Sequence, residues 1–245
     1  MILDDTSREI YTRQIMMKEI GEEGQQKLND ASVLVIGCGG LGAPTLSYLT
    51  AMGIGHLGLC DCDTIALSNM NRQLLFEMAD MDKSKAQMAQ KRLLSLNPRL
   101  KTTVYDCFLD EELAAKIVPQ YDIVVDCLDN FNTRLVLNDA CVTAGVPLVH
   151  AGIGEFYGQL MTITPGSGPC LRCLLPNKKK EEGPKKPFGV VGPTPGVLGT
   201  MQALEVLKYL VGLPVANDGL VIYDGLALNI EKVKIEPLAE CFCQQ

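Results

Sequence analysis

A glycine-rich turn directly after a short apolar run is the feature that most constrains this 245-residue chain. The apolar run 33–36 leads into Gly37-Cys38-Gly39-Gly40-Leu41-Gly42, a Gly-x-Gly-x-x-Gly pattern, and a helix-compatible segment follows. An uninterrupted apolar run is typical of a buried parallel strand. The glycines allow a tight turn, a close approach of backbone to phosphate, and close packing of helix on strand. We therefore predict that a nucleotide phosphate binds at this helix N-terminus, and the alternative is a turn without a ligand.

Strand and helix patterns alternate between residues 33 and 150. The further strands are predicted over 56–60, 102–105, 122–125 and 147–150, and the helices over 43–52, 82–95, 110–118 and 131–144. This order is typical of a doubly wound parallel sheet. The later patterns are an alternating strand over 155–164, an apolar helix over 196–211, and strands over 221–224 and 228–235. We expect an α/β fold with a Rossmann-like doubly wound, mostly parallel sheet that antiparallel strands extend in the C-terminal third.

The chain is expected to form a single domain over residues 1–245. Residues 1–30 hold an N-terminal helical segment that lies outside the nucleotide fold. Residues 31–150 form the nucleotide-binding half, and residues 151–245 form a second half. Within that second half, residues from about 174 to 195 are rich in Lys, Glu, Gly and Pro, which predicts a mobile loop.

Composition argues against two classes of partner. The net charge of −7 disfavours nucleic acid, because binding to phosphate backbones needs an excess of Lys and Arg. No apolar run reaches 18 residues, so no membrane span is expected. The first ten residues are polar and acidic, unlike a secretory signal. A cytoplasmic location is therefore expected.

Ten cysteines in a reducing compartment are expected to be thiols or metal ligands rather than disulfides. Two pairs stand out by their spacing, Cys170-x-x-Cys173 and Cys241-x-Cys243. Four thiolates suit a structural zinc ion with all four tetrahedral positions filled. The second pair has one residue fewer than the usual Cys-x-x-Cys, and free thiols at a frayed chain end are the alternative.

Acidic side chains follow the predicted strands at the edge where a doubly wound sheet binds its ligand. Asp61 ends the second strand, 24 residues after Gly37, where this architecture holds a ribose hydroxyl. Asp126 and Asp129 both follow the fourth strand and are both candidate ligand-binding residues. Asn130 has a second interpretation as the N-cap of the next helix.

Three cations accompany these carboxylates. Lys85 lies in the first turn of a predicted helix, where the dipole disfavours a cation, so a nearby anion is predicted, with a solvated surface lysine as the alternative.

The chain has only two histidines and no recognisable Ser/His or Cys/His arrangement. A reaction whose nucleophile is already ionised, such as a carboxylate, needs alignment and neutralisation of phosphate charge. Arg13, Arg72, Lys85 and a metal held by Asp129 would supply that neutralisation.

The ordered set of motifs resembles a family, the bacterial ubiquitin-activating-like adenylyltransferases that act on sulfur carriers for molybdopterin synthase and thiamine. The motifs that carry the resemblance are Tyr11-Thr12-Arg13-Gln14, the glycine turn, Asp61-Cys62-Asp63, Ser68-Asn69-Met70-Asn71-Arg72-Gln73, Lys85, Asn97-Pro98, Asp126-Cys127-Leu128-Asp129-Asn130 and Cys170-x-x-Cys173. They are spaced as in the family with almost no gaps, and they cover nearly the whole chain.

The resemblance implies the chemistry. The C-terminal Gly-Gly carboxylate of a small ubiquitin-like sulfur-carrier protein attacks the α-phosphate of ATP, an acyl-adenylate forms, and pyrophosphate leaves. The implied cofactors are ATP, Mg²⁺ and a structural Zn²⁺. The implied partners are the carrier and a second copy of the chain in a homodimer, because Arg13 is similar to the family arginine that reaches ATP from the other subunit. The loop at 174–195 is similar to the crossover loop that covers the carrier's tail.

The resemblance also assigns residues. Asp61 holds the ribose, while Asn69, Arg72 and Gln73 grip phosphates. Lys85 neutralises the α-phosphate region, and Asp129 holds magnesium. The full predicted nucleotide set is Gly37, Gly39, Gly40, Gly42, Asp61, Asn69, Arg72, Gln73, Lys85, Asp129 and Asn130, and the predicted catalytic set is Arg13, Arg72, Lys85 and Asp129.

One departure from the family limits the expected chemistry. Some relatives carry a cysteine in the crossover loop where this chain has Gly192, and residues 174–240 contain none. We therefore expect adenylation alone, without a covalent thioester or persulfide step at that place. The two alternative functions are an NAD-dependent oxidoreductase, which the glycine turn and Asp61 would also permit, and a non-catalytic carrier-binding module of the same fold.

Overall fold

One eight-stranded sheet, in the order β3-β2-β1-β4-β5-β6-β7-β8, organises the computed structural model, which describes residues 3–176 and 189–244. Strands β1 to β5 run parallel, and β6, β7 and β8 pair antiparallel beyond them. The fold class expected from the sequence is confirmed. The strands are β1 (Ser32–Ile36), β2 (His56–Cys60), β3 (Lys101–Tyr105), β4 (Ile123–Asp126), β5 (Leu148–Gly154), β6 (Tyr157–Ile163), β7 (Gly219–Asp224) and β8 (Asn229–Lys234).

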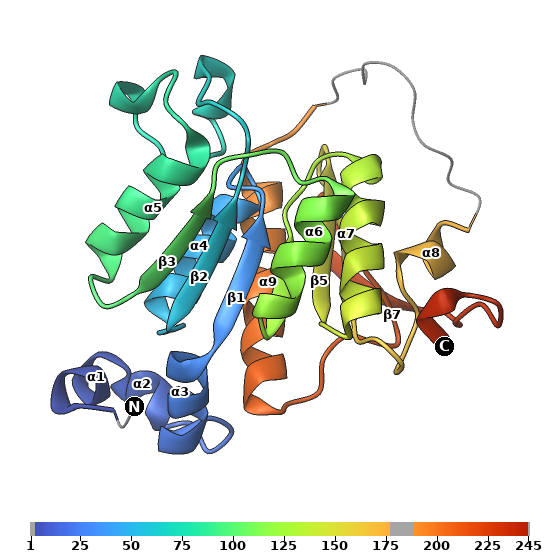
Figure 1. Cartoon of the computed structure of the whole chain (residues 1–245), viewed down its shortest axis with the longest axis horizontal. Helices are drawn as coiled ribbons and strands as arrows, with labels where there is room; N and C mark the ends of the chain where they lie inside the picture. The colour runs from blue at the N-terminus through green and yellow to red at the C-terminus, as the bar shows by residue number, and fades with distance from the viewer. Residues whose placement is uncertain (1–2, 177–188, 245) are drawn as a thin grey trace.

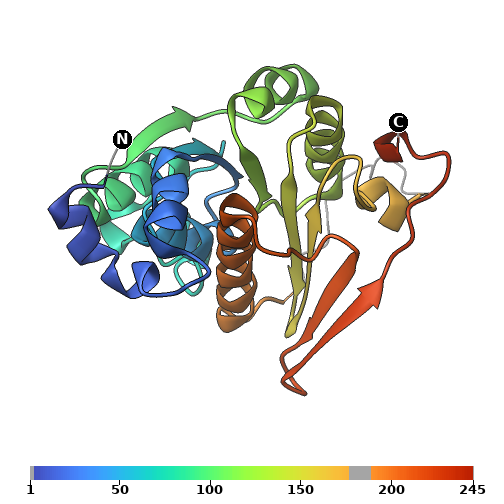
Figure 2. The same cartoon turned by 90° about the horizontal axis from the view of Figure 1, so that it is seen from below.

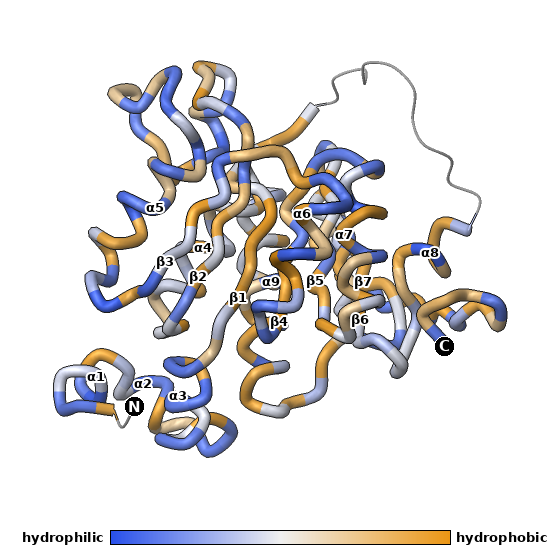
Figure 3. Tube along the Cα trace, in the orientation of Figure 1, coloured by the Kyte–Doolittle hydropathy of each residue, from blue (hydrophilic) through white to orange (hydrophobic). Residues whose placement is uncertain are grey.

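Helices cover both faces of the parallel half (Figures 1 and 2). The apolar cluster on one face includes Val33 and Val35 of β1 with side chains of α4 (Gly42–Ala51), α5 (Lys85–Leu96) and α9 (Pro193–Val211). The cluster on the other face includes Leu34 and Ile36 with side chains of α6 (Glu111–Ile117) and α7 (Phe131–Ala144). Successive residues of β1 therefore enter opposite cores, which explains its unbroken apolar run, orange in Figure 3.

The N-terminal segment is largely helical over residues 5–29, as the sequence predicts, and the helical segment breaks at Gly21, where the apolar pattern suggests an interruption. It forms three helices, α1 (Asp5–Ile10), α2 (Thr12–Ile15) and α3 (Gly21–Asp30). Gly21 adopts a φ of 59°, a left-handed conformation that separates α3 from the preceding turn. All three lie beyond the amino end of β1 in Figure 1.

Several boundaries shift by a few residues. β5 continues to Gly154, four residues past the predicted end, because it pairs along its whole length with β6. α9 begins at Pro193, three residues before the predicted start, because proline is tolerated in the first turn of a helix. The remaining short helices are α8 (Leu171–Leu174), η1 (Leu67–Asn69), η2 (Met78–Asp80), η3 (Val118–Gln120) and η4 (Phe242–Gln244).

The loop predicted at 174–195 falls largely outside the described residues, which omit 177–188. The residues of this loop that follow the gap, from Gly189 on, are hydrogen-bonded to the turn between β5 and β6. The Glu155 N–H donates to the Gly189 carbonyl at 2.8 Å, and the Thr194 hydroxyl donates to the Glu155 carbonyl at 3.0 Å. Across the described residues, none of the helices combines the length and the apolar character that a membrane crossing requires.

Candidate active site

A cavity of about 1210 Å³ opens at the carboxyl ends of the parallel strands. Its wall gathers nine residues of the predicted nucleotide set, although they come from segments up to 93 positions apart in the chain. These are Gly37, Gly39, Gly40, Asp61, Arg72, Gln73, Lys85, Asp129 and Asn130. Ligands of open α/β sheets bind at this edge.

The glycine turn is shaped by backbone contacts that a side chain would prevent. Gly37 has a φ of 101°, and a Cβ there would lie 2.6 Å from the carbonyl oxygen of Cys127. A Cβ at Gly42 would lie 2.0 Å from the Gly37 carbonyl oxygen, so this glycine closes the turn inward. Gly42 accordingly is not among the cavity-lining residues, whereas Gly39 and Gly40 are.

Asp61 ties the glycine turn to the end of β2. Its Oδ2 accepts a hydrogen bond from the Cys38 N–H at 2.7 Å, and its Oδ1 accepts one from the Asp63 N–H at 2.8 Å. Burial raises the pKa of Asp61, while these two donors act in the opposite direction. Asp61, which the sequence analysis assigned to a ribose, thus also organises the loop that lines the cavity.

Lys85 is buried at the cavity wall although it begins α5. Its side chain is only 8% exposed, and Nζ lies 2.8 Å from Oδ2 of Asp63. The anion predicted to accompany Lys85 is therefore a carboxylate of the chain itself. Arg72 also lines the cavity, and its Nη1 donates to the Ser68 carbonyl at 2.8 Å. Two cations in one cavity suit a ligand with several negative charges.

Gln73 keeps hydrogen-bonding capacity for a ligand. Its side chain is buried, and its Oε1 has no hydrogen-bond partner among the described residues. Unpaired buried polar atoms are costly unless a ligand or water completes them. The two cations suit phosphate oxygens, whereas this oxygen is an acceptor and suits a hydroxyl or amino group of the same ligand.

Besides Gly42, two predicted site residues lie away from the cavity wall, Asn69 of the nucleotide set and Arg13 of the catalytic set. Asn69 is buried and absent from the cavity wall, because its Oδ1 accepts from the Ala66 N–H at 3.0 Å within the η1 turn. Arg13 is exposed on α2, beyond the amino end of β1, whereas the cavity lies at the carboxyl ends of the strands. The structure of one chain therefore does not bring Arg13 to the cavity.

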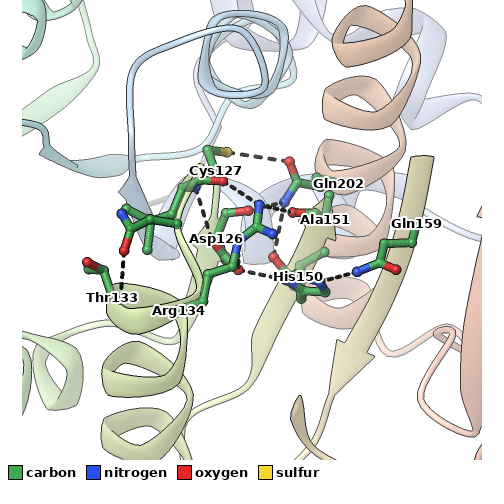
Figure 4. A network of polar contacts seen from close by, with 11 residues as sticks. Asp126, Cys127, Thr133, Arg134, His150, Ala151, Gln159 and Gln202 are labelled. Atoms are coloured by element: carbon green, nitrogen blue, oxygen red, sulfur yellow. Dashed lines mark hydrogen bonds and ion pairs between the residues drawn. The ribbon is translucent and has the colours of Figure 1, made fainter. Parts of the chain in front are cut away.

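Asp126 does not face the cavity as a free ligand, in contrast to the expectation for carboxylates after the fourth strand. It is fully buried, with Oδ2 at 2.6 Å from Nδ1 of His150 and 3.4 Å from Nε of Arg134 (Figure 4). Burial raises the pKa of Asp126, but the Arg134 cation and the His150 contact outweigh it and lower that pKa overall. Burial lowers the pKa of His150. We call Asp126, Arg134 and His150 the buried corner. It therefore holds an ionised Asp126, a charged Arg134 and a neutral His150.

Sequence reasoning missed several side chains that line the cavity, including Phe108, Arg134, Tyr157 and Gln159. A signal for Arg134 was present, because it falls in the first turn of α7, the position that drew attention to Lys85. Tyr157 and Gln159 carry no such signal, since only the pairing of β6 with β5 brings them to the cavity.

The four predicted metal ligands come together at the other end of the chain. The Sγ atoms of Cys170, Cys173, Cys241 and Cys243 all lie within 4.8 Å of one another. The contacts Cys170–Cys241 and Cys173–Cys243 each measure 3.6 Å. A tetrahedral zinc ion with Zn–S bonds of about 2.3 Å implies S–S edges of about 3.8 Å. The thiol cluster, as we call these four residues, therefore has the donor set and the size for such an ion.

The chain is similar to known proteins over most of its length. A model described as the ThiF family matches residues 11–244. The sulfur carrier protein ThiS adenylyltransferase of Escherichia coli (strain K12) is 42% identical over 232 residues, covering 94% of this chain and 92% of the relative. The adenylyltransferase and sulfurtransferase MOCS3 of Xenopus laevis is 43% identical over 228 residues, covering 92% of this chain. The chain spans about half of that relative, 51% of its length.

A solved structure shares the fold. The crystal structure of E. coli MccB with MccA-N7isoASN superposes with a TM-score of 0.86 at 23% identity, covering 99% of this chain and 76% of that chain.

Proposed function

The chain belongs to the ThiF family, and on that premise we propose that it adenylates the C-terminal Gly-Gly carboxylate of a small ubiquitin-like sulfur-carrier protein. It is an adenylyltransferase, and the pathways served by such carriers are thiamine or molybdopterin biosynthesis. The observation that supports the proposal is the cavity, whose lining includes Gly37, Gly39, Gly40, Arg72, Lys85 and Asp129.

The cavity residues have distinct roles in the proposed reaction. The glycine turn takes the phosphates of ATP against backbone N–H groups at the start of α4. Arg72 and Lys85 offset charge as the carrier's carboxylate attacks the α-phosphate and pyrophosphate leaves. Lys85 exchanges its Asp63 partner for phosphate oxygens in this step. The cavity keeps the reacting groups aligned and the adenylate away from water.

Asp129 is the residue that would hold magnesium. It is exposed at the cavity wall beside Asn130, and magnesium commonly binds through one or two protein oxygens together with substrate phosphates. When bound, the ion offsets charge on the triphosphate. The thiol cluster is proposed to hold a structural zinc ion, which a reducing cytoplasm permits by keeping the thiols free.

A homodimer would complete the site. Arg13 is exposed and remote from the cavity of its own chain, so we propose that it enters the cavity of a second subunit. Residues 1–245 are proposed to act as one adenylating unit, in which residues 31–150 bind the nucleotide. Residues 151–245 would bind the carrier and the zinc ion, with the loop at 174–195 over the carrier's tail.

ATP–pyrophosphate exchange with a panel of purified carriers ending in Gly-Gly tests the function. We expect exchange with at least one carrier, and a loss of about 100-fold or more in Asp129→Ala, because one charge-stabilising group is worth that much in comparable sites. Asp5→Ala, which removes an exposed carboxylate on α1, is the matched control and should exchange at the wild-type rate.

Wild-type pyrophosphate exchange in Asp129→Ala would show that Asp129 has no role in the reaction. Carrier binding without exchange in the wild-type protein would indicate a non-catalytic binding module. Tight NADH binding with no effect of ATP on the melting temperature would indicate an oxidoreductase.

A further inference from the structure

Arg134 joins the loop after β4 to the neighbouring strand. Its side chain is 7% exposed and starts from the first turn of α7. Nη2 donates to the carbonyl oxygen of Leu128 in the loop, and also to the carbonyl oxygen of Ala151 on β5, the latter at 2.8 Å (Figure 4). One guanidinium group therefore fixes the loop relative to the sheet.

The carboxylate of Asp126 holds the same loop from the other side of the peptide. Its Oδ1 accepts from the Leu128 N–H at 3.0 Å, while its Oδ2 faces Arg134. Leu128 thus has both backbone polar groups bound, one by the anion and one by the cation of a buried pair. The residue that follows it is Asp129, at the cavity wall.

The rest of the corner keeps this pair in place. His150 contacts Oδ2 of Asp126, and Nε2 of Gln159 lies 3.2 Å from Nε2 of His150. Nε2 of Gln202 on α9 donates to the backbone carbonyls of Asp126 at 2.8 Å and Val149 at 3.1 Å. These contacts come from β5, β6 and α9, so Asp126, the ion-pair partner of Arg134, is held by packed elements rather than by the loop.

We propose that Arg134 is a positioning residue that sets the place of Asp129 by holding Leu128 against β5. This inference rests on the proposed function, in which Asp129 holds magnesium. A guanidinium presents several N–H groups in a planar fork and reaches two carbonyls at once, whereas a lysine offers a compact point charge. Groups that orient a metal ligand typically contribute 10- to 100-fold to metal affinity.

The test uses Arg134→Lys, which keeps the charge beside Asp126 but not the fork. We expect the magnesium concentration for half-maximal pyrophosphate exchange to rise about 10-fold or more, with the rate largely recovered at saturating magnesium. In the protein without nucleotide, we expect faster hydrogen exchange at the amides of residues 128–130 and unchanged exchange in β1. A purely structural loss would slow the reaction at every magnesium concentration.

Two further variants complete the design. Arg172→Lys is the matched control, because Arg172 pairs with Asp139 between α8 and α7, away from the cavity, and should leave both readouts unchanged. If Arg134→Lys does not fold, the double variant Asp126→Asn/Arg134→Met removes both charges, which buried pairs commonly tolerate. It should show the same magnesium shift and the same loss of amide protection.

The outcomes separate this inference from the proposed function. Wild-type magnesium dependence and wild-type amide protection in Arg134→Lys would overturn the positioning role. A raised KM for the carrier with unchanged amides would also overturn it, because Arg134 would then contact the carrier directly. If the wild-type protein showed no pyrophosphate exchange with any of the carriers, the proposed function would be overturned. The amide hydrogen exchange of residues 128–130 would still report on the position of the loop.

Discussion

The buried corner at Asp126 and the thiol cluster neutralise charge by opposite means. The corner contains a carboxylate, a guanidinium and a neutral imidazole, so the chain itself supplies both signs of charge. The thiol cluster brings together four groups of one kind, three of them buried and Cys241 partly so. As thiolates they would repel one another, and only a cation can balance them. The corner balances its charges with the chain's own groups, whereas the thiol cluster has the donor set for a cation.

Their surroundings differ in the same sense. The corner lies where β4 and β5 pair, between the two apolar cores. The cluster links α8 to the chain end after β8, and all six residues of β8 are exposed. Little apolar burial therefore holds β8, so the last part of the chain depends on the cluster far more than the centre of the sheet depends on any ligand.

The largest effect is expected from breaking the thiol cluster. Cys173→Ser removes one of four ligands, and bound zinc should fall from about one per chain to near zero. The free energy that protects residues 229–244 from local unfolding should fall by about 5 kcal/mol or more, because metal binding and local folding are coupled. Metal analysis and hydrogen exchange measure the two quantities.

Cys62→Ser is the control, because Cys62 is an exposed thiol outside the thiol cluster. It should retain the metal and the protection. A wild-type protein purified without metal, yet fully protected over 229–244, would mean that the cluster does not need an ion.

The second prediction concerns the corner. Asp126→Asn leaves Arg134 buried without its anion, and we expect a loss of about 3–5 kcal/mol in the free energy of unfolding. Adding Arg134→Met should restore much of that stability, since neither charge then remains. Urea unfolding of the two variants gives the comparison. A double variant as unstable as the sum of its single changes would show that the two charges do not compensate each other.

Much of the fold followed from local patterns. The run 33–36 before Gly37 predicted a strand buried on both faces, and Asn130 was correctly considered as the cap of α7, since its Oδ1 accepts from the Thr133 N–H at 2.9 Å. The possible break at Gly21 is confirmed, whereas the division between α1 and α2 was not predicted, because a periodic apolar pattern continues across it. The extension of β5 was missed because it depends on pairing with β6, a contact between strands.

The cavity residues that the sequence predicted are those that lie near the carboxyl ends of strands. Asp61 directly follows β2 and Lys85 begins α5, and both lie on the cavity wall. No role was predicted for Arg134 or for His150, because their role depends on Asp126 turning inward, toward partners that the sequence places 8 and 24 residues away. Whether a carboxylate at a strand end faces a ligand or a buried cation is decided by packing.

The smallest expected effect is the change of the free energy of unfolding with pH. It tests whether the imidazole of His150 is uncharged in the native state. Burial lowers the pKa of His150, so the native state keeps the imidazole neutral while the unfolded chain binds a proton below about pH 6.5. Stability should therefore be highest above pH 7 and fall toward pH 5, by at most about 1.4 kcal/mol per pH unit for this group. The lowered pKa of Asp126 affects stability only at lower pH, below the ordinary value of 3.8.

His150→Gln should flatten this dependence, because glutamine can still donate to Asp126 but does not titrate. Urea unfolding at pH 5, 6 and 7 should show a loss between pH 7 and 5 that is smaller than in the wild type by about 1–2 kcal/mol. His56, the other histidine, is less buried, and its pKa is also lowered, by burial and by Lys101. His56→Gln should therefore change the slope less. An unchanged slope in His150→Gln would mean that the corner accepts a proton, and that its charges are not balanced by Asp126 and Arg134 alone.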